Sequence, residues 1–290
     1  MSQESIVFYN GSFIREGDFT LSPFSRALHY GDGVFETMRA YGGAVFRFDL
    51  HLERFFSGLQ TLSITNRWAR RDIYTAVSEL LMKNGLGDAS VKILGFRSGP
   101  DGPNPVPGSG ADIMIAARPF DAAKKALYEK GITACVASNR RNKDSIIAAI
   151  KSLNYLENII GRIEAAKKGC DEVLFLNTCG NVAEGATSNI FIVKKGSIAA
   201  PPLHAGILNG ITRGAVIQIA REKGIACNDK DILLDDVLSA DEVFLTNSLM
   251  EIMPLVRVDD TAIGGGSPGM VTMKLMSDYR ALVEKELAGG

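Results

Sequence analysis

One stretch of the sequence, residues 151–189, constrains the fold and chemistry of the chain more than any other. It reads KSLNYLENIIGRIEAAKKGCDEVLFLNTCGNVAEGATSN. After Lys151, apolar residues recur at helical spacing and predict an amphipathic helix that ends at Gly169. A short apolar strand follows, then Glu184, then a second buried strand from Asn189. The apolar stripe of the predicted helix consists of Leu156, Ile159, Ile160 and Ile163.

Lys151 and Glu184 together suggest a site at which an amine forms an imine. Such an amine must be partly desolvated or close to other cations, so that some of it is neutral near pH 7. Tyr155 follows four residues after Lys151, on the same face if the helix has already begun. A pyridoxal phosphate site also needs an acid that keeps the ring nitrogen protonated, and Glu184 can supply it. The alternative is that Lys151 is a solvated lysine and Glu184 a turn residue.

Residues 34–41 are the second informative segment, because apolar and polar side chains alternate along it. This alternation predicts a β-strand with one face in a cleft. Phe35, Thr37 and Arg39 then share one side, where an aromatic ring, a hydroxyl and a guanidinium can meet one ligand. The alternative is that Arg39 is a surface arginine and that Phe35 belongs to the core.

Two predicted helices bear on ligand binding. The first has Asp49 as its cap, and Arg54 lies off its apolar stripe, where most arginines are solvated. The second follows Gly210, which lets the backbone approach a ligand. The free N–H groups of Ile211 and Thr212 at the start of that helix would hold a phosphate.

Four segments carry a resemblance to a known family. KSLNYLEN, AEGATSN, GILNGITR and FLTNSLMEIMPL are similar, in order and spacing, to segments of class IV pyridoxal-phosphate enzymes of fold type IV. That family includes branched-chain aminotransferases, D-amino-acid aminotransferases and 4-amino-4-deoxychorismate lyases. The resemblance runs from about Phe8 to Leu255 and implies an α/β (α+β) chain of two domains, like D-amino-acid aminotransferase, that pairs as a homodimer. It also implies a small amino-acid or aminodeoxychorismate substrate.

Position by position, the resemblance implies roles for individual residues. Lys151 forms the imine and shuttles a proton, Glu184 pairs with the pyridine nitrogen, and Tyr155 lies near the ring hydroxyl. HLERF places Arg54 where the family uses an arginine for the cofactor phosphate, a dianion that a bidentate guanidinium suits. The other implied cofactor contacts are the backbone of Ile211 and Thr212, Asn247 and Ser248, and the implied substrate contacts are Tyr30, Phe35, Arg39 and Arg97, the arginines for a carboxylate.

Within the family, sequence details favour the lyase. FETMR with Thr37 and TNS with Asn247 match the lyase pattern, whereas branched-chain aminotransferases usually have glycine in place of Thr37. The hydroxyl of Thr37 would position or relay a proton as pyruvate and 4-aminobenzoate form, a step of folate biosynthesis. The alternatives are a transaminase that acts on branched-chain L-amino acids or on D-amino acids with 2-oxoglutarate, and a non-catalytic pyridoxal-phosphate-binding dimer.

The length of the chain and its loop-forming segments predict the domain organisation. We expect an N-terminal α/β domain over 1–119, a linker over 120–130 and a C-terminal α/β domain over 131–290 that carries Lys151. The Gly/Pro-rich loop over 98–110 is too long for a mere connection and predicts an active-site flap.

Composition narrows the partners. A net charge of −1 without a large block of Lys and Arg argues against nucleic acid. No run of 18 apolar residues occurs, and no basic region followed by an apolar run opens the chain, so we expect a cytoplasmic protein with no membrane contact. Four cysteines without CxxC spacing and only three histidines predict no metal site.

Overall fold

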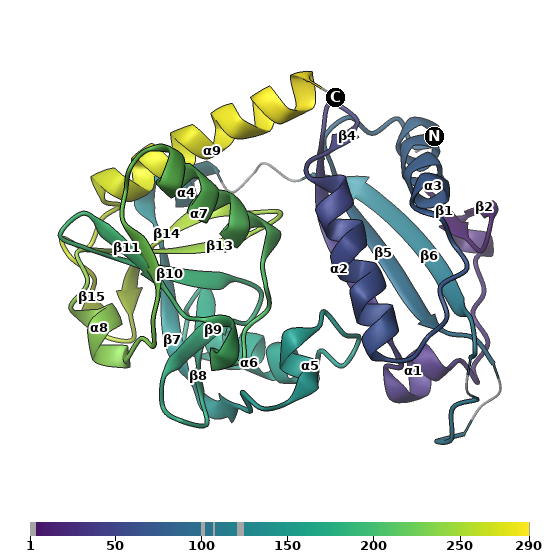
Figure 1. Cartoon of the computed structure of the whole chain (residues 1–290), viewed down its shortest axis with the longest axis horizontal. Helices are drawn as coiled ribbons and strands as arrows, with labels where there is room; N and C mark the ends of the chain where they lie inside the picture. The colour runs from purple at the N-terminus through teal and green to yellow at the C-terminus, as the bar shows by residue number, and fades with distance from the viewer. Residues whose placement is uncertain (1–3, 100–101, 107, 121–124, 290) are drawn as a thin grey trace. The chain divides into compact units, whose positions relative to one another are not determined.

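Figure 1 shows a computed structural model of the chain, which describes residues 4–99, 102–106, 108–120 and 125–289. The chain divides into two units. Unit 1 comprises Met1–Asp121 and Ile150–Asn154, and unit 2 comprises Ala122–Ala149 and Tyr155–Gly290. Parts of the expected linker and of the expected flap loop lie outside the described residues.

Unit 1 is built on a six-stranded antiparallel sheet in the order β2-β1-β6-β5-β3-β4. Asn10 and Gly11 connect its first hairpin, and both adopt positive φ angles, 46° and 92°. The strands are β1 (Ile6–Tyr9), β2 (Ser12–Arg15), β3 (Gly33–Tyr41), β4 (Ala44–Val45), β5 (Ala89–Arg97) and β6 (Ala111–Pro119).

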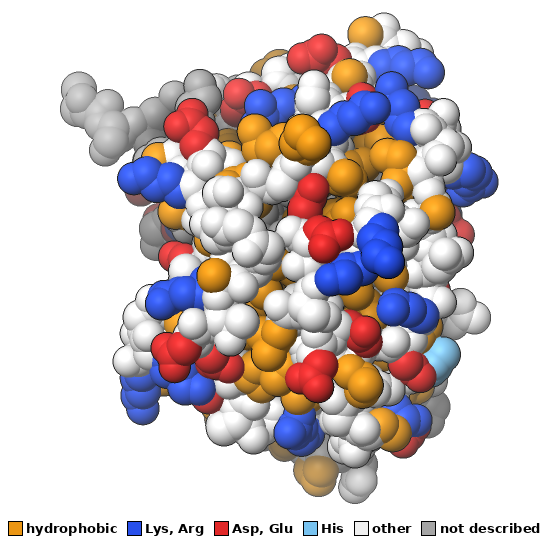
Figure 2. Space-filling view, turned by 90° about the vertical axis from the view of Figure 1, so that its left-hand side faces the viewer, with side chains coloured by type: hydrophobic (Ala, Val, Ile, Leu, Met, Phe, Trp, Pro, Cys, Tyr) orange, Lys and Arg blue, Asp and Glu red, His pale blue; other side chains and the backbone are white. Residues whose placement is uncertain are grey.

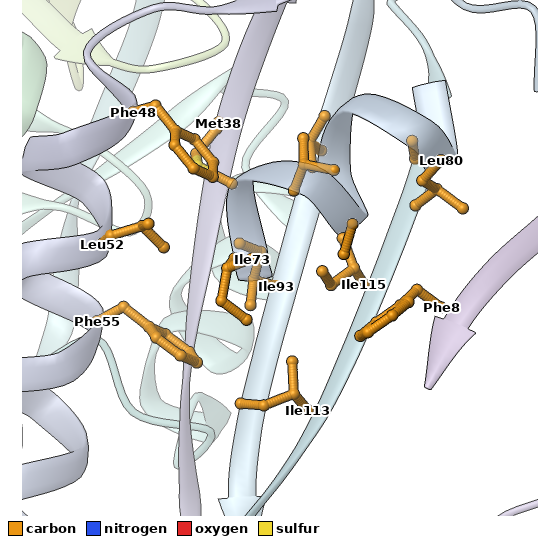
Figure 3. Close-up of a cluster of buried hydrophobic side chains, with 14 of the residues drawn as sticks. Phe8, Met38, Phe48, Leu52, Phe55, Ile73, Leu80, Ile93, Ile113 and Ile115 are labelled. Carbon is orange, nitrogen blue, oxygen red and sulfur yellow. The ribbon is translucent and has the colours of Figure 1, made fainter. Parts of the chain in front are cut away.

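The core of unit 1 lies between this sheet and two helices, α2 (Phe48–Thr61) and α3 (Arg70–Lys83); a shorter helix, α1 (Arg26–Tyr30), precedes β3. In Figure 3, Leu52 and Phe55 of α2 and Ile73 of α3 point toward Ile93 and other strand residues. Burial of such side chains stabilises the fold by roughly 1.5–3 kcal/mol each. One face of the sheet is therefore covered by helices.

The start of α2 differs from the prediction. Arg47 is the residue before the helix and has a left-handed conformation, with φ of 52°. Asp49 therefore stands within the first turn rather than at the cap. There its charge still favours the positive end of the helix dipole.

Unit 2 is built on a mixed nine-stranded sheet in the order β12-β11-β10-β13-β14-β7-β8-β9, with β15 paired to β14. Strand β7, between β14 and β8, runs parallel to both of these neighbours. The buried apolar runs predicted around Val173 and Ile190 form β8 and β10. The strands are β7 (Ile132–Arg141), β8 (Glu172–Asn177), β9 (Val182–Gly185), β10 (Asn189–Lys194), β11 (Ser197–Ala200), β12 (Cys227–Asp229), β13 (Glu242–Asn247), β14 (Glu251–Val258) and β15 (Thr261–Ala262).

The helices of unit 2 include the one predicted after Lys151. They are α4 (Lys125–Lys130), α5 (Ile146–Ala149), α6 (Leu156–Lys167), α7 (Ile211–Glu222), α8 (Leu234–Leu238) and α9 (Met270–Ala288). As predicted, α7 follows Gly210 directly. It buries Val216, Ile219 and Ala220.

Helix α6 turns its apolar stripe outward, which corrects the expectation of an ordinary amphipathic helix. The face toward β8 carries Gly161 and Ala165, and a Cβ atom added to Gly161 would collide with Phe175. Close approach of the helix to the sheet admits only small residues there. The large stripe residues are consequently exposed: Leu156 by 69%, Ile159 by 46%, Ile160 by 48% and Ile163 by 50%.

Residues 150–154 group with unit 1, although we expected Lys151 in the C-terminal domain. The reason is backbone pairing with β3. The Phe35 N–H donates to the Lys151 carbonyl (2.8 Å), and the Leu153 N–H donates to the Gly33 carbonyl (2.9 Å). The segment therefore extends the sheet of unit 1 locally and brings Lys151 to Phe35.

Candidate active site

The sheet face of unit 1 that is opposite the core carries the residues predicted from the alternation in β3. Residues paired in antiparallel strands point to the same side of a sheet. The core residue Met38 points to the helix-covered side. On the other side, Phe35, Thr37 and Arg39 of β3 lie opposite Leu94, Lys92 and Ser90 of β5.

Two lysines approach the ring of Phe35. Lys151 Nζ lies 4.5 Å from the ring centroid, and Lys92 Nζ lies 5.3 Å from it. Both amines therefore lie against the same aromatic ring, on the sheet face opposite the core. Sequence reasoning missed Lys92, although a charged residue at an alternate position of the apolar strand VKILGF was a usable signal.

Arg39 is held by aromatic rings. Its guanidinium carbon lies 3.6 Å from the ring centroid of Phe120 and 4.4 Å from that of Tyr41. Such stacking fixes the plane of a guanidinium and suits it to recognise a carboxylate. Tyr30, at the end of α1, is 40% exposed, and its ring contacts the guanidinium of Arg26.

Arg97 occupies a different place from the one expected for a substrate ligand. It lies one residue beyond Phe96 in β5, so it points to the core side of the sheet. Its guanidinium donates twice to Asp32 (2.9 and 3.4 Å) and once each to the carbonyls of Ser63 (3.0 Å) and Leu62 (2.6 Å). Arg97 therefore joins β5 to the turn after α1 and to the end of α2, and a substrate role does not fit this placement.

Arg54 is clamped by a buried carboxylate. Its Nε and Nη2 atoms donate to the two oxygens of Glu36 at 2.7 and 2.8 Å, and His51 Nδ1 lies 2.8 Å from Glu36 Oε2. Burial would raise the pKa of Glu36, but the charge of Arg54 and the hydrogen bonds from His51 and Arg54 outweigh it and lower the pKa to about 2. Glu36 is thus ionised.

Glu184 is the centre of a buried polar cluster in unit 2. Its carboxylate accepts hydrogen bonds from Arg141 Nη1 (3.0 Å), Asn189 Nδ2 (3.2 Å) and the Leu208 N–H (3.0 Å). The side chains of Glu184 and Arg141 are 8% and 7% exposed, so solvent screens their ion pair little. The guanidinium of Arg141 also stacks on Phe175, at 4.6 Å. This arrangement fixes an anionic carboxylate in one orientation.

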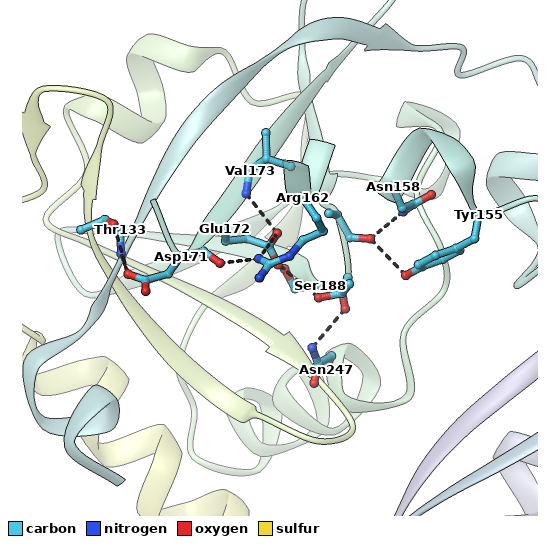
Figure 4. Close-up of polar contacts among 11 residues, drawn as sticks. Thr133, Tyr155, Asn158, Arg162, Asp171, Glu172, Val173, Ser188 and Asn247 are labelled. Atoms are coloured by element: carbon cyan, nitrogen blue, oxygen red, sulfur yellow. Dashed lines mark hydrogen bonds and ion pairs between the residues drawn. The ribbon is translucent and has the colours of Figure 1, made fainter. Parts of the chain in front are cut away.

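Tyr155, just before α6, contributes a phenol close to this carboxylate. Its hydroxyl donates to the Ala186 carbonyl (3.1 Å), which also accepts from Asn158 Nδ2 (Figure 4). Burial, followed by the negative charges of Glu184 and Glu172, raises the pKa of Tyr155 to about 12. The phenol consequently stays protonated near neutral pH. Unit 2 thus brings together two of the residues predicted for the cofactor ring.

The loop between β9 and β10 is held by the buried carboxylate of Glu172. Glu172 accepts hydrogen bonds from Thr187 Oγ1 (3.2 Å) and Ser188 Oγ (3.4 Å) and pairs with Arg162 (3.2 Å), as Figure 4 shows. This loop begins two residues after Glu184, behind Gly185. A second buried carboxylate therefore orders the backbone beside the first.

Asn247, which we expected at the cofactor, uses its amide within the protein. Its Nδ2 donates to the Thr187 carbonyl (3.1 Å), and its Oδ1 accepts from the N–H groups of Leu249 (3.0 Å) and Met250 (2.8 Å). These contacts shape the turn after β13. Ser248, in that turn, is half-buried.

The start of α7 lies close to the Glu184 cluster. A Cβ atom on Gly210 would collide with Oδ1 of Asn189, whose amide nitrogen donates to Glu184. The glycine thus permits a close approach that other residues forbid. Ile211 and Thr212 form the first turn of this helix of 12 residues, whose positive end suits a phosphate.

Each unit, taken by itself, carries side chains of the kinds that pyridoxal phosphate requires. Unit 1 has a primary amine and an oriented arginine, and unit 2 has a fixed carboxylate, a protonated phenol and a helix start. The mixed α/β architecture matches pyridoxal-phosphate enzymes of fold type IV. The chain belongs to the class IV aminotransferases, because residues 33–258 match the family model described as amino-transferase class IV.

Several relatives resemble the chain along nearly its whole length. A putative branched-chain-amino-acid aminotransferase of Methanocaldococcus jannaschii is 37% identical over 96% of both chains. The D-alanine aminotransferase of Bacillus licheniformis is 28% identical over 97% of this chain and 98% of its own. Among solved structures, the branched-chain amino acid aminotransferase of Escherichia coli has a TM-score of 0.91 and 32% identity, with 97% of this chain and 95% of that chain covered.

On the face that Figure 2 shows, acidic and basic side chains are interspersed. Within the part of the chain that the structure describes, no helix is long and apolar enough to cross a membrane. The same residues contain no group of three or more His, Cys, Asp or Glu side chains placed to hold a metal ion.

Proposed function

We propose that the protein is a transaminase that exchanges the amino group of a branched-chain L-amino acid with 2-oxoglutarate. The observation that carries this proposal is the similarity to branched-chain aminotransferases along almost the entire chain. It takes precedence over the lyase that we expected from Thr37 and Asn247. The placement of Asn247 also speaks against the lyase, because its amide orders a turn.

We assign the cofactor roles to residues of both units. Pyridoxal phosphate, when bound, withdraws electrons from the Cα atom of an amino acid joined to it. Lys151 Nζ would take the proton from Cα and return it to the carbon of the former aldehyde in the first half-reaction, and would carry out the reverse transfer in the second. Glu184, held by Arg141, keeps a negative charge for the ring nitrogen, and the Tyr155 phenol, whose hydroxyl donates to the Ala186 carbonyl, would lie near the ring hydroxyl.

Two cations on the open sheet face suit the substrate carboxylates. Arg39 is stacked and oriented, and Lys92 stands beside Thr37 on the neighbouring strand. A 2-oxo dicarboxylate needs one cation more than an aliphatic amino acid does. The aliphatic side chain of the branched-chain amino acid would pack against Phe35 and Leu94 on the same face.

A substrate panel tests the proposal. L-leucine, L-isoleucine and L-valine should each convert the bound cofactor to its amine form, with loss of the long-wavelength absorption band, and 2-oxoglutarate should restore the band. D-alanine should convert it far more slowly. Release of pyruvate and 4-aminobenzoate from 4-amino-4-deoxychorismate without any oxo acid would instead favour the lyase.

The role of Lys151 has its own test. Borohydride reduction of the holoenzyme should attach the cofactor to the peptide that contains Lys151, as mass spectrometry can show. Lys151→Ala should lose this attachment and the yellow colour, while Lys285→Ala, in the last turn of α9, should keep both. Attachment at another lysine would overturn the assignment.

We also propose that the protein forms a homodimer through α6. The exposed stripe of Leu156, Ile159, Ile160 and Ile163 is a continuous aliphatic surface, and such surfaces mark protein interfaces. A second copy of α6 suits it, because antiparallel pairing about a twofold axis would bring Glu157 of the first turn toward Lys167 of the last.

A further inference from the structure

Glu36 stands out among the buried groups of unit 1, because it is a fully buried carboxylate that the proposed chemistry does not use. It is 0% exposed and lies in β3 on the helix-covered side, directly between Phe35 and Thr37. An isolated carboxylate in such a place would be very costly, so its partners must be present in the folded state. Those partners are Arg54 and His51 of α2.

The geometry of the contact restrains Arg54 strongly. Two parallel hydrogen bonds, from Nε and Nη2 to the two Glu36 oxygens, fix both the position and the plane of the guanidinium. Arg54 is itself only 15% exposed. The Nε–Nη2 edge of the guanidinium is thus occupied by Glu36. Because the group is planar, its remaining nitrogen, Nη1, points away from the carboxylate.

His51 completes the clamp from one side. Burial lowers the pKa of His51, more than the hydrogen bond and charge of Glu36 raise it, so the imidazole is neutral near pH 7. Because Glu36 is ionised and can only accept, Nδ1 of His51 must carry the proton of their hydrogen bond. His51 therefore holds the carboxylate without adding a second positive charge that would compete with Arg54.

We propose that Glu36 is a positioning residue that aims the guanidinium of Arg54 at the phosphate of the cofactor. This inference rests on the proposed phosphate role of Arg54. Glu36 touches no reacting atom. It acts by removing the rotational freedom of a long side chain, so that less entropy is lost when the phosphate binds.

The test compares two aldehydes, pyridoxal phosphate and pyridoxal, which lacks the phosphate. Both are titrated into the cofactor-free full-length protein and followed by absorbance. Glu36→Gln should weaken pyridoxal phosphate binding roughly tenfold or more, the size expected when a charge-assisted hydrogen bond is lost. Binding of pyridoxal should stay unchanged. Equal weakening of both aldehydes, or of neither, would overturn the proposal.

A double-mutant cycle separates positioning from general damage. In an Arg54→Met background, Glu36→Gln should cause no further loss of pyridoxal phosphate affinity, because the group that it aims is gone. Additive losses would contradict the proposal. If Arg54→Met weakened both aldehydes equally, the phosphate role itself would fail, whichever amino acid the enzyme prefers.

Two further variants guard against misfolding. Glu242→Gln weakens the cap of α9, since the Glu242 carboxylate accepts hydrogen bonds from the N–H groups of Val271 and Thr272 at the start of that helix. It should lower stability without changing the affinity ratio of the two aldehydes. If Glu36→Gln does not fold, Glu36→Asp, which keeps the charge and withdraws it by one methylene, should lower that ratio. An unchanged ratio in Glu36→Asp would equally refute the proposal.

Discussion

At the scale of single residues, Lys92 is the cation whose role is most directly testable. We expect Lys92→Met to raise the KM for 2-oxoglutarate about tenfold, because one charge-assisted contact to the second carboxylate is lost. The KM for 4-methyl-2-oxopentanoate, which has one carboxylate, should change little. Steady-state kinetics with both oxo acids and with Lys285→Met as control measure this. An equal rise for both oxo acids would show that Lys92 does not distinguish them.

The phenol of Tyr155 should make the stability of the folded protein fall at alkaline pH. Its pKa in the folded state is raised to about 12 from the ordinary value of 10.0. The folded state therefore binds this proton more tightly than the unfolded state, and the associated stability is complete below pH 10 and is lost as pH rises toward 12. Urea unfolding at pH 9 and 11 should show a smaller decline for Tyr155→Phe than for the wild type. Equal declines would contradict this.

Residue roles were predictable where they depended on local pattern. Alternation alone identified the shared face of Phe35, Thr37 and Arg39, since side chains in a strand repeat every two residues. The prediction for Arg97 was wrong because the sequence does not show that β5 still alternates at its last residue. This alternation turns Arg97 to the core side, where it binds Asp32. The clamp of Glu36 on Arg54 was likewise hidden, because it joins a strand to a helix 18 residues later.

At the scale of elements, the exposed stripe of α6 lets us test the proposed dimer interface. Ile160→Glu should shift the protein from dimer to monomer, because a charge would be buried in an apolar interface. Light scattering coupled to size-exclusion chromatography measures this. Met273→Glu on α9 is a matched control, since Met273 is 45% exposed and Ile160 is 48% exposed. A dimer that survives Ile160→Glu would place the interface elsewhere.

Element boundaries and types followed from the sequence better than element orientation did. Gly169 and Gly210 correctly marked a helix end and a helix start. The inward face of α6, however, is set by space rather than by polarity. Gly161 faces Phe175 because nothing larger fits there, and a pattern of polar and apolar residues carries no information about such fit.

At the scale of the whole molecule, each unit has a hydrophobic core of its own. Leu59 in unit 1 and Leu245 in unit 2 are both 0% exposed members of these cores. Leu59→Ala and Leu245→Ala should each lower the free energy of unfolding by about 2–5 kcal/mol. Hydrogen exchange followed by mass spectrometry should show the larger loss of protection in the strands of the mutated unit. Identical exchange maps would mean that the units unfold as one.

The assignment of residues 150–154 to unit 1 has a consequence for any attempt to divide the protein. A cut between Asp121 and Ala122 would leave the first fragment without the piece of chain that bears the reactive amine. The second fragment would carry that piece with no strand edge to lie on. Transamination would thus return only when the two fragments reassemble, which makes this break point suitable for a split-enzyme reporter of protein association.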